Sequence, residues 1–187
     1  MSRLYLASKS PQREMLLSKL TTDFKIIEVD INEAKKAGEP ISEYLLRVSV
    51  AKAMAARQRL NKGIYILSAD TEVVHNNKIL GKPKTHKNAV DMLMSLSGQE
   101  HIVYTMVVLL TDKQNHVLST NHVWFRTLNR NECEKYCYKY PPMDKTGAYG
   151  IQDFAAGFIN RLEGSFSGVM GLPLRETKQL LLHANIF

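Results

Sequence analysis

The chain has 187 residues, with 25 Lys and Arg against 18 Asp and Glu, and therefore a formal net charge of +7. Hydrophobic residues make up 44% and there are two Cys, a composition typical of a globular protein that excludes a disordered chain or a disulfide-stapled miniprotein. The length predicts a single domain over residues 1–187. The positive charge indicates an anionic partner, which is a nucleic acid, a membrane surface or a phosphorylated small molecule.

Features that the sequence lacks limit the cellular locations and the kinds of site that we expect. The N-terminal segment has no long apolar run of the kind found in secretory signals. The longest nearly apolar run, residues 102–110, is far shorter than the ~20 residues that a membrane-spanning helix needs. Cys133, Tyr136, Cys137 and Tyr140 have helical spacing, which predicts a buried helix face rather than a redox or metal site. We expect a cytoplasmic protein, because two cysteines without a secretory signal favour a reducing compartment.

The first half of the chain alternates predicted strands and helices. Short apolar runs predict strands at residues 4–7, 24–29 and 64–67. The first helix begins at Ser10 and Pro11, because Ser is a good N-cap and Pro suits the first helical position. A longer helix is predicted from a cap at Ser42. The third strand is predicted to end in the polar segment 68–71.

The second half adds two helices, consecutive strands and a Gly-rich segment. One helix is predicted from Thr85 to Gly98, and Asn129 with Glu132 resembles a capping box that begins another. A last helix follows Pro173. Strands are predicted at residues 101–110 and 122–127, joined through residues 115–120. Alternating strands and helices indicate an α/β fold, and the consecutive strands indicate a mixed sheet.

Two segments carry side chains suited to phosphate chemistry. The strand–helix junction at residues 7–13 directs backbone N–H groups and the positive end of a helix dipole to one point. Asp70 follows a buried strand, where an acid can bind a metal or act as a general base. Taken singly, a capped helix with exposed basic residues explains the junction, and a turn or capping Asp explains Asp70 equally well.

Two later segments have similar character. Lys82 lies between Gly81 and Pro83, on a turn that suits a polyphosphate. The run at residues 144–153 has two glycines that allow close backbone approach, and the Gln152 amide suits the edge of a nucleobase. Taken singly, a solvated basic loop and a turn-rich strand connection explain these two segments.

The order of these motifs resembles one family along essentially the whole chain. The motifs are LASxSPxRxxLL at residues 6–17, ADTxV at 69–73, LGKP at 80–83, KxGAYGIQ at 145–152 and GLPL at 171–174. Together they resemble the Maf family of nucleoside triphosphate pyrophosphatases, whose members are also described as septum-formation inhibitors. The resemblance implies a mixed, twisted sheet flanked by helices, with two lobes and a central cleft, similar to inosine triphosphate pyrophosphatases.

The resemblance also implies an activity and a set of site residues. Maf-like proteins cleave a nucleoside triphosphate between the α and β phosphates with a divalent metal, Mg²⁺ or Mn²⁺. Asp70 matches the catalytic acid, and Glu33 with Asp70 matches the metal-binding carboxylates. The positions that would hold the substrate are Ser8, Arg13, Lys52 and Lys82. Lys and Arg side chains and a metal offset the charge of a triphosphate, which is concentrated on phosphate oxygens during in-line attack.

Three further positions bear on the choice of base. Thr71 and Gln152 resemble the subgroup that acts on dTTP and UTP rather than the subgroup that acts on 7-methyl-GTP. Gln12 departs from both, because the first subgroup has Arg there and the second often has Trp. The alternatives are a 7-methyl-GTP-type pyrophosphatase and a non-catalytic nucleotide-binding regulator of cell division. We expect the protein to bind a nucleoside triphosphate and to bind neither nucleic acid nor a membrane. A homodimer is compatible with this expectation.

Overall fold

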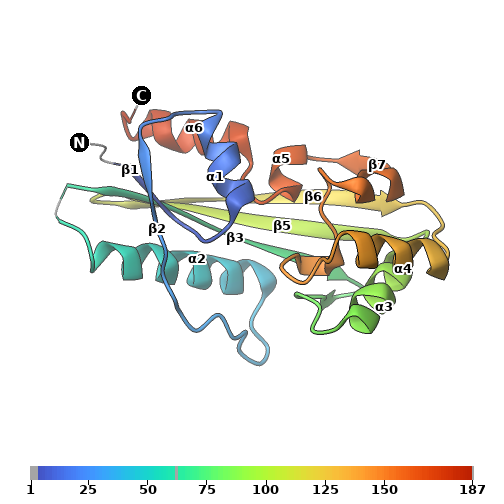
Figure 1. Cartoon of the computed structure of the whole chain (residues 1–187). Coiled ribbons are helices and arrows are strands. Elements are labelled where there is room, and N and C mark those ends of the chain that lie inside the picture. Colours follow the sequence, from blue (N-terminus) through green and yellow to red (C-terminus); the bar gives the residue numbers. More distant parts are fainter. Residues whose placement is uncertain (1–3, 62, 187) are drawn as a thin grey trace. The chain divides into compact units, whose positions relative to one another are not determined.

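The computed structural model describes residues 4–61 and 63–186 and contains one mixed sheet flanked by helices (Figure 1). Its strands are β1 (Leu4–Ala7), β2 (Phe24–Ile27), β3 (Tyr65–His75), β4 (Lys78–Ile79), β5 (Glu100–Leu110), β6 (Gln114–Phe125) and β7 (Ile159–Glu163). The strand order is β2-β1-β3-β5-β6-β7, and β4 pairs with β3. β1 is parallel to β2 and β3, whereas β6 is antiparallel to β7. The predicted α/β class with a mixed sheet is confirmed.

Three of the predicted helix caps are formed. The helices are α1 (Pro11–Ser18), α2 (Ile41–Arg57), α3 (His86–Leu96), α4 (Arg130–Lys139), α5 (Phe166–Val169) and α6 (Leu174–His183), with short 3-10 helices η1 (Thr146–Ala148) and η2 (Phe154–Phe158). The Ser10 and Thr85 side chains cap α1 and α3, and Asn129 with Glu132 forms a capping box on α4. None of the helices in the described residues is long and apolar enough to span a membrane.

The prediction that Ser42 caps the second helix is wrong. α2 begins at Ile41, with Pro40 in the cap position and no side-chain cap. The Tyr44 N–H donates to the Pro40 carbonyl at 2.9 Å, so helical hydrogen bonding begins before Ser42. The backbone of Pro40 is extended, so the helix begins directly after it. Because proline has no backbone N–H, one fewer donor is left unpaired at this end of the helix.

The predicted end of the third strand is also wrong, because β3 continues through residues 68–71 to His75. Polar residues in this stretch suggested a loop, yet Ser68 and Asp70 are buried and have partners on α2. β3 then turns into β4 at Asn76 and Asn77, whose positive φ angles of 48° and 60° are typical of a tight hairpin. The segment at residues 115–120, predicted as a connection or as part of a strand, belongs to the single long strand β6.

The chain divides into two compact units. The first unit comprises Met1–Asp70, Thr105–Ser119 and Gly171–Phe187. Within it, Figure 1 shows α1 and α6 on one side of the strands and α2 on the other. Its core contains fully buried leucines from β1, α1, α2 and β3, namely Leu6, Leu17, Leu45 and Leu67. These side chains fix α1 and α2 on β1 and β3, the two strands that carry the site.

The second unit comprises Thr71–Tyr104 and Thr120–Met170, and its helices α3 and α4 pack together. Cys133, Tyr136 and Cys137 are buried, as their spacing predicted. Tyr140 is 37% exposed, because α4 ends at Lys139 and Tyr140 leaves the helical path. Both thiols are free, and burial raises the pKa of each to about 11, so they are unreactive packing residues.

Candidate functional site

Ser8 and Asp70 lie at the same edge of the sheet in the first unit. The parallel register pairs Ala7 of β1 with Ser68 of β3, so β1 ends where β3 continues. Ser8 follows the last residue of β1, and Asp70 stands two residues beyond Ser68. Both side chains are buried. The site is therefore at the carboxyl end of β1, where α/β proteins bind ligands.

Lys52 joins two carboxylates at this edge. Its Nζ lies 2.7 Å from Asp70 Oδ1 and 2.8 Å from Glu33 Oε1. Asp70 and Ser68 point to the same face of β3, since side chains alternate along a strand. That face meets α2, because the Ser68 hydroxyl donates to the Ser49 carbonyl at 2.7 Å, and Lys52 follows Ser49 by one helical turn. The packing of α2 on β3 thus sets the Lys52–Asp70 pair.

The two carboxylates differ in their surroundings. The side chains of Lys52 and Asp70 are only 11% and 12% exposed, whereas the Glu33 side chain is 52% exposed. A buried ammonium needs a charged partner, and Asp70 supplies it from a rigid strand. Glu33 comes from the loop between β2 and α2. One carboxylate is therefore fixed by the sheet, and the other depends on how that loop is held.

Arg47 holds the loop that carries Glu33. Its guanidinium donates to both Glu39 oxygens, at 2.6 and 2.9 Å, and to the Ala34 carbonyl at 3.0 Å. The hydrogen bonds to Arg47 lower the pKa of Glu39 to about 2, so this clamp stays charged at ordinary pH. The sequence analysis missed Arg47, because an Arg on a helix usually faces solvent and the loop contacts join residues 13 positions apart.

Arg13 lies in the electrostatic field of the two carboxylates. Its Nε donates to the Gly171 carbonyl at 2.9 Å, which ties α1 to the turn before α6. Burial lowers the pKa of Arg13, while Asp70 and Glu33 act to raise it. A guanidinium nevertheless remains protonated in proteins. The first unit thus contains the Lys52, Glu33 and Asp70 cluster, Arg13 within its electrostatic influence, and Ser8 at the same edge of the sheet.

Gln12 is folded onto the cap of α1. Its Oε1 accepts a hydrogen bond from the Ser10 hydroxyl at 3.1 Å, and the same hydroxyl accepts the Arg13 N–H at 3.4 Å. The Ser8 hydroxyl accepts the Ser10 N–H at 3.1 Å. The hydroxyls at the start of α1 are therefore linked through Ser10, and Gln12 is part of that group.

Lys82 belongs to the second unit and is exposed. The turn that carries it contacts the Gly-rich segment, because the Gly147 N–H donates to the Gly81 carbonyl at 2.8 Å. Both glycines have positive φ angles, 63° and 73°. A Cβ on Gly147 would lie 2.9 Å from Val73 Cγ2, so only glycine fits there. Two motifs more than 60 residues apart in the sequence thus form one local structure.

Gln152 lies beside a glycine that leaves room for three side chains. A Cβ on Gly150 would be 2.5 Å from Asp153 Oδ2, 3.1 Å from Gln152 Nε2 and 3.2 Å from Lys145 Cε. Lys145 Nζ also lies 3.9 Å from Asp153 Oδ2. Gln152 is exposed, which leaves its amide open to a ligand. Thr71, the other predicted specificity residue of this unit, follows Asp70 directly in β3.

Glu33 and Asp70 are the residues that fit a divalent cation. No cluster of three or more His, Cys, Asp or Glu suited to a metal occurs in the described parts of the chain. Mg²⁺ is usually bound by one or two carboxylates together with substrate phosphates and water. Two carboxylate oxygens that meet one ammonium at 2.7 and 2.8 Å are a donor set of this kind. The residues present therefore fit a cation bound together with a phosphorylated ligand.

Comparisons with known proteins agree with the motifs. A protein of Vibrio parahaemolyticus named dTTP/UTP pyrophosphatase is 44% identical over 179 residues, which is 95% of each chain. One of Cupriavidus metallidurans with the same name is 44% identical over 196 aligned residues, covering 99% of this chain and 98% of the other. Among solved structures, the Ham1 protein of Staphylococcus aureus is 14% identical with a TM-score of 0.47, over 65% of this chain and 71% of that one.

The family match covers residues 3–184 and is to the Maf-like proteins. It includes all of the motifs that the sequence analysis singled out and each residue of the Asp70, Lys52 and Glu33 cluster. Because this match extends over nearly the whole sequence, the chain belongs to the Maf family.

Proposed function

We propose that this protein hydrolyses dTTP and UTP between the α and β phosphates, releasing the nucleoside monophosphate and pyrophosphate. The observation that carries the proposal is the buried Lys52 held by Asp70 and Glu33 at the carboxyl end of β1. The names of the two relatives support the substrate class. Such substrates are made and used in the cytoplasm, where we expect the protein to act.

Asp70 is the proposed general base. Its carboxylate accepts a proton from water as the water oxygen forms a bond to the α phosphorus, and the bond between the α phosphorus and the oxygen bridging to the β phosphate breaks. Pyrophosphate leaves with the electron pair of that bond. Before ligands bind, Lys52 orients Asp70, since their side chains are in direct contact at 2.7 Å.

The cationic side chains of the first unit bind the phosphates. Arg13 and Lys52 supply positive charge, and the Ser8 hydroxyl supplies a hydrogen-bond donor at the start of α1. A divalent cation held by Glu33 and Asp70, Mg²⁺ or Mn²⁺, would supply further charge stabilisation. The resemblance also assigns Lys82 to the phosphates, and this role rests on the resemblance alone.

Base preference is proposed for Thr71, Gln152 and Gln12. The Gln152 amide can accept from the N3–H of uracil or thymine and donate to a neighbouring carbonyl. Gln12 replaces a cation of the dTTP/UTP subgroup with a neutral amide that is bonded to Ser10. We therefore expect Gln12→Arg to raise kcat/KM for dTTP or UTP, because it restores a charged group beside the phosphates.

The decisive experiment is hydrolysis of a panel of nucleoside triphosphates with Mg²⁺ or Mn²⁺, with products separated by chromatography. We expect dTTP and UTP to give monophosphate and pyrophosphate, and Asp70→Asn to lower the rate by about 10²–10⁴-fold with an unchanged melting temperature. A preference for 7-methyl-GTP would overturn the substrate assignment. Release of orthophosphate would overturn the proposed cleavage between the α and β phosphates. Full activity of Asp70→Asn would overturn the proposed role of Asp70 as the general base.

A further inference from the structure

We infer that the ammonium of Lys52 and a divalent cation compete for the same two carboxylates, so that cation binding requires Lys52 to release Glu33 and Asp70. The inference deepens the proposed function and rests on it for the identity of the cation. It assigns Lys52 a second role, as the residue that couples the binding of the cation to the binding of the triphosphate.

The geometry places one positive charge where another would bind. Lys52 Nζ contacts Asp70 Oδ1 and Glu33 Oε1 at 2.7 and 2.8 Å, and the Lys52 side chain is 11% exposed. A cation that used both carboxylates would have to lie between the same two oxygens. Two cations in so small and poorly solvated a space repel each other strongly. The Lys52 ammonium and the divalent cation therefore cannot both hold the pair.

Lys52 has a route out of this position. Its ammonium stands on a flexible four-carbon stem, and Glu33, 52% exposed, leaves the cluster open on one side. Asp70, which is 12% exposed, does not lose its charged partner in the exchange, because the incoming cation replaces the ammonium. The released ammonium needs a new anion, and a triphosphate provides one. Cation and triphosphate should each tighten the binding of the other, because coupling between two ligands is reciprocal.

Removal of the ammonium should consequently favour the cation. In Lys52→Met the stem is kept and the charge is lost, which leaves Asp70 buried without its partner, 12% exposed. An unpaired buried carboxylate is unfavourable, and a divalent cation relieves it. The matched control is Lys9→Met, which also removes one positive charge from the first unit. Lys9 pairs with Asp30 and contacts neither Glu33 nor Asp70 directly, and it acts on Glu33 only through its charge.

The first measurement is titration of the purified protein with Mn²⁺ in the absence of nucleotide, with free Mn²⁺ followed by electron paramagnetic resonance. We expect Lys52→Met to bind Mn²⁺ about 10-fold more tightly than the unmodified protein, and Lys9→Met to change the Kd less than about 2-fold. An equal or weaker Mn²⁺ affinity of Lys52→Met, in a sample whose circular dichroism and melting curve show a folded protein, would overturn the inference. Lys52→Gln serves as the second variant if Lys52→Met does not fold.

The second measurement repeats the titration with a dTTP analogue that has a methylene bridge between the α and β phosphates. We expect the analogue to tighten Mn²⁺ binding to the unmodified protein by about 10-fold, and much less in Lys52→Met. Equal tightening in both proteins would contradict the coupling. Neither titration requires turnover, so a protein that hydrolyses no nucleotide would refute the proposed function while leaving the Mn²⁺ competition to be decided by the first measurement.

Discussion

At the scale of single residues, the buried polar side chains are explained by their partners. Lys52 lies inside the first unit because Asp70 and Glu33 surround its ammonium, and Ser68 is buried because its hydroxyl bonds to α2. His101 is the corresponding residue of the second unit. Its Nε2 bonds to the Tyr149 hydroxyl at 2.7 Å, and Phe125 packs edge-on against its ring at 4.9 Å. These contacts suit a neutral imidazole.

His101 should make stability depend on pH. Burial, with a smaller contribution from His75, lowers the pKa of His101 from 6.5 to about 3. The unfolded chain therefore binds a proton that the folded protein does not between these values. The contribution of neutral His101 is fully present above pH 6.5 and is lost as the pH falls toward 3, by at most about 1.4 kcal/mol for each pH unit.

The measurement is the free energy of unfolding by urea at several pH values between 4 and 7, for the protein and for His101→Gln. We expect a shallower pH dependence for the variant, because glutamine does not titrate. Carboxylates contribute equally to both curves and cancel in their difference. Parallel curves would contradict the prediction, because they would show that His101 titrates alike in the folded and unfolded states.

At the scale of elements, the site depends on how loops are attached to rigid strands and helices. Asp70 is placed by β3 and Lys52 by α2, whereas Glu33 is placed by a loop that Arg47 clamps at Ala34 and Glu39. In the second unit, the turn at Gly81 is tied to the Gly-rich segment through Gly147. Loops of this kind owe their positions to a few hydrogen bonds, which makes them sensitive to single substitutions.

Loss of the Arg47 clamp should lower activity more than stability. We expect Arg47→Met to reduce kcat/KM for dTTP about 10-fold or more, because Glu33 is no longer held beside Lys52 and small displacements of site residues are costly. Arg57→Met is the control, since Arg57 lies on the same helix but bonds to the carbonyls of Leu110 and Thr111. Equal kinetics of the two variants would contradict the role of Arg47 in positioning the loop.

A side chain at Gly150 should change the choice of base rather than the chemistry. In Gly150→Ala the new methyl group meets Asp153 Oδ2 and Gln152 Nε2, at 2.5 and 3.1 Å, so both side chains must move. We expect the ratio of kcat/KM values for UTP and CTP to shift by about 10-fold, since one misplaced polar contact to a base is worth this much.

The control for this prediction is Gly157→Ala, at a glycine where an added Cβ would have no neighbour within 4 Å. We expect it to keep the original ratio of kcat/KM values. If Gly150→Ala lowers the rates for all nucleotides by the same factor, the segment serves the chemical step and not base selection.

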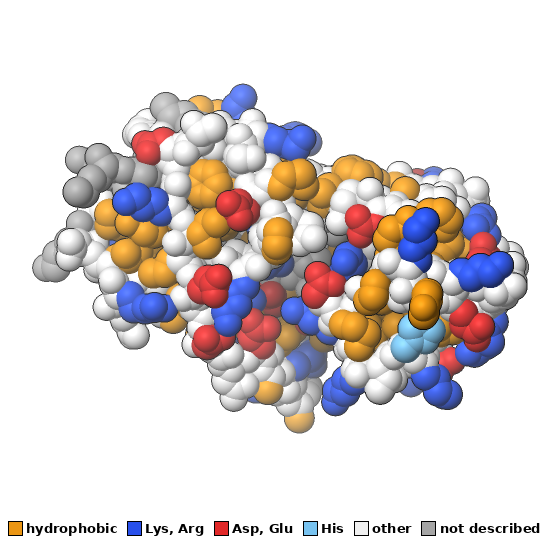
Figure 2. Space-filling model, in the orientation of Figure 1, with side chains coloured by type: hydrophobic (Ala, Val, Ile, Leu, Met, Phe, Trp, Pro, Cys, Tyr) orange, Lys and Arg blue, Asp and Glu red, His pale blue; other side chains and the backbone are white. Residues whose placement is uncertain are grey.

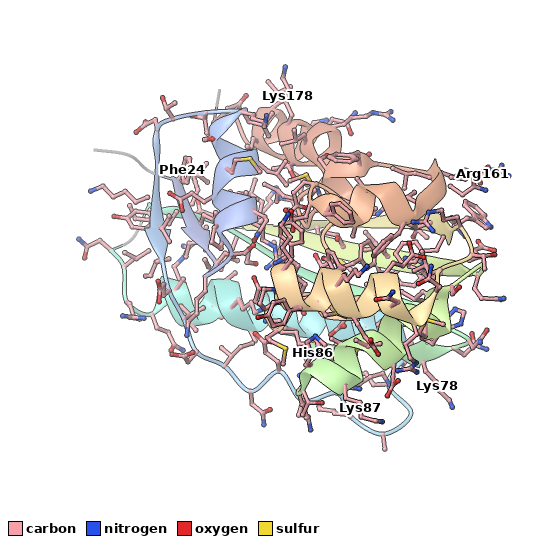
Figure 3. All side chains as sticks on the ribbon, turned by 45° about the vertical axis from the view of Figure 1, so that its right-hand side comes forward. Phe24, Lys78, His86, Lys87, Arg161 and Lys178 are labelled. Carbon is pink, nitrogen blue, oxygen red and sulfur yellow. The ribbon has the colours of Figure 1, made fainter. Side chains whose placement is uncertain are left out.

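At the scale of the molecule, the net charge of +7 comes from many Lys and Arg side chains dispersed over the surface and from a few at the candidate site. Figure 2 shows Lys and Arg side chains interspersed with acidic ones on the visible face, with no continuous basic stripe. Lys78, Lys87, Arg161 and Lys178 extend away from the ribbon in Figure 3, and all are exposed. Lys52, by contrast, contacts both carboxylates of the site, and Arg13 interacts with them electrostatically.

Much of the fold was predictable from local sequence. The caps at Ser10, Thr85 and Asn129 and the buried face of α4 depend on residues three or four positions apart, which a sequence displays directly. The end of β3 and the start of α2 were predicted wrongly, because Asp70 and Ser68 resemble loop residues unless their partners on α2 are known.

The amino-acid sequence by itself determined the α/β class, the chemical types of the site residues and, through its ordered motifs, the family. The tertiary structure alone decided that Lys52 contacts both Glu33 and Asp70, and that Arg47 holds the loop that carries Glu33. The physical reason is that each of these contacts joins a helix to a strand or loop. Their geometry depends on the register of β1 with β3 and on the packing of α2, which burial of the whole core determines.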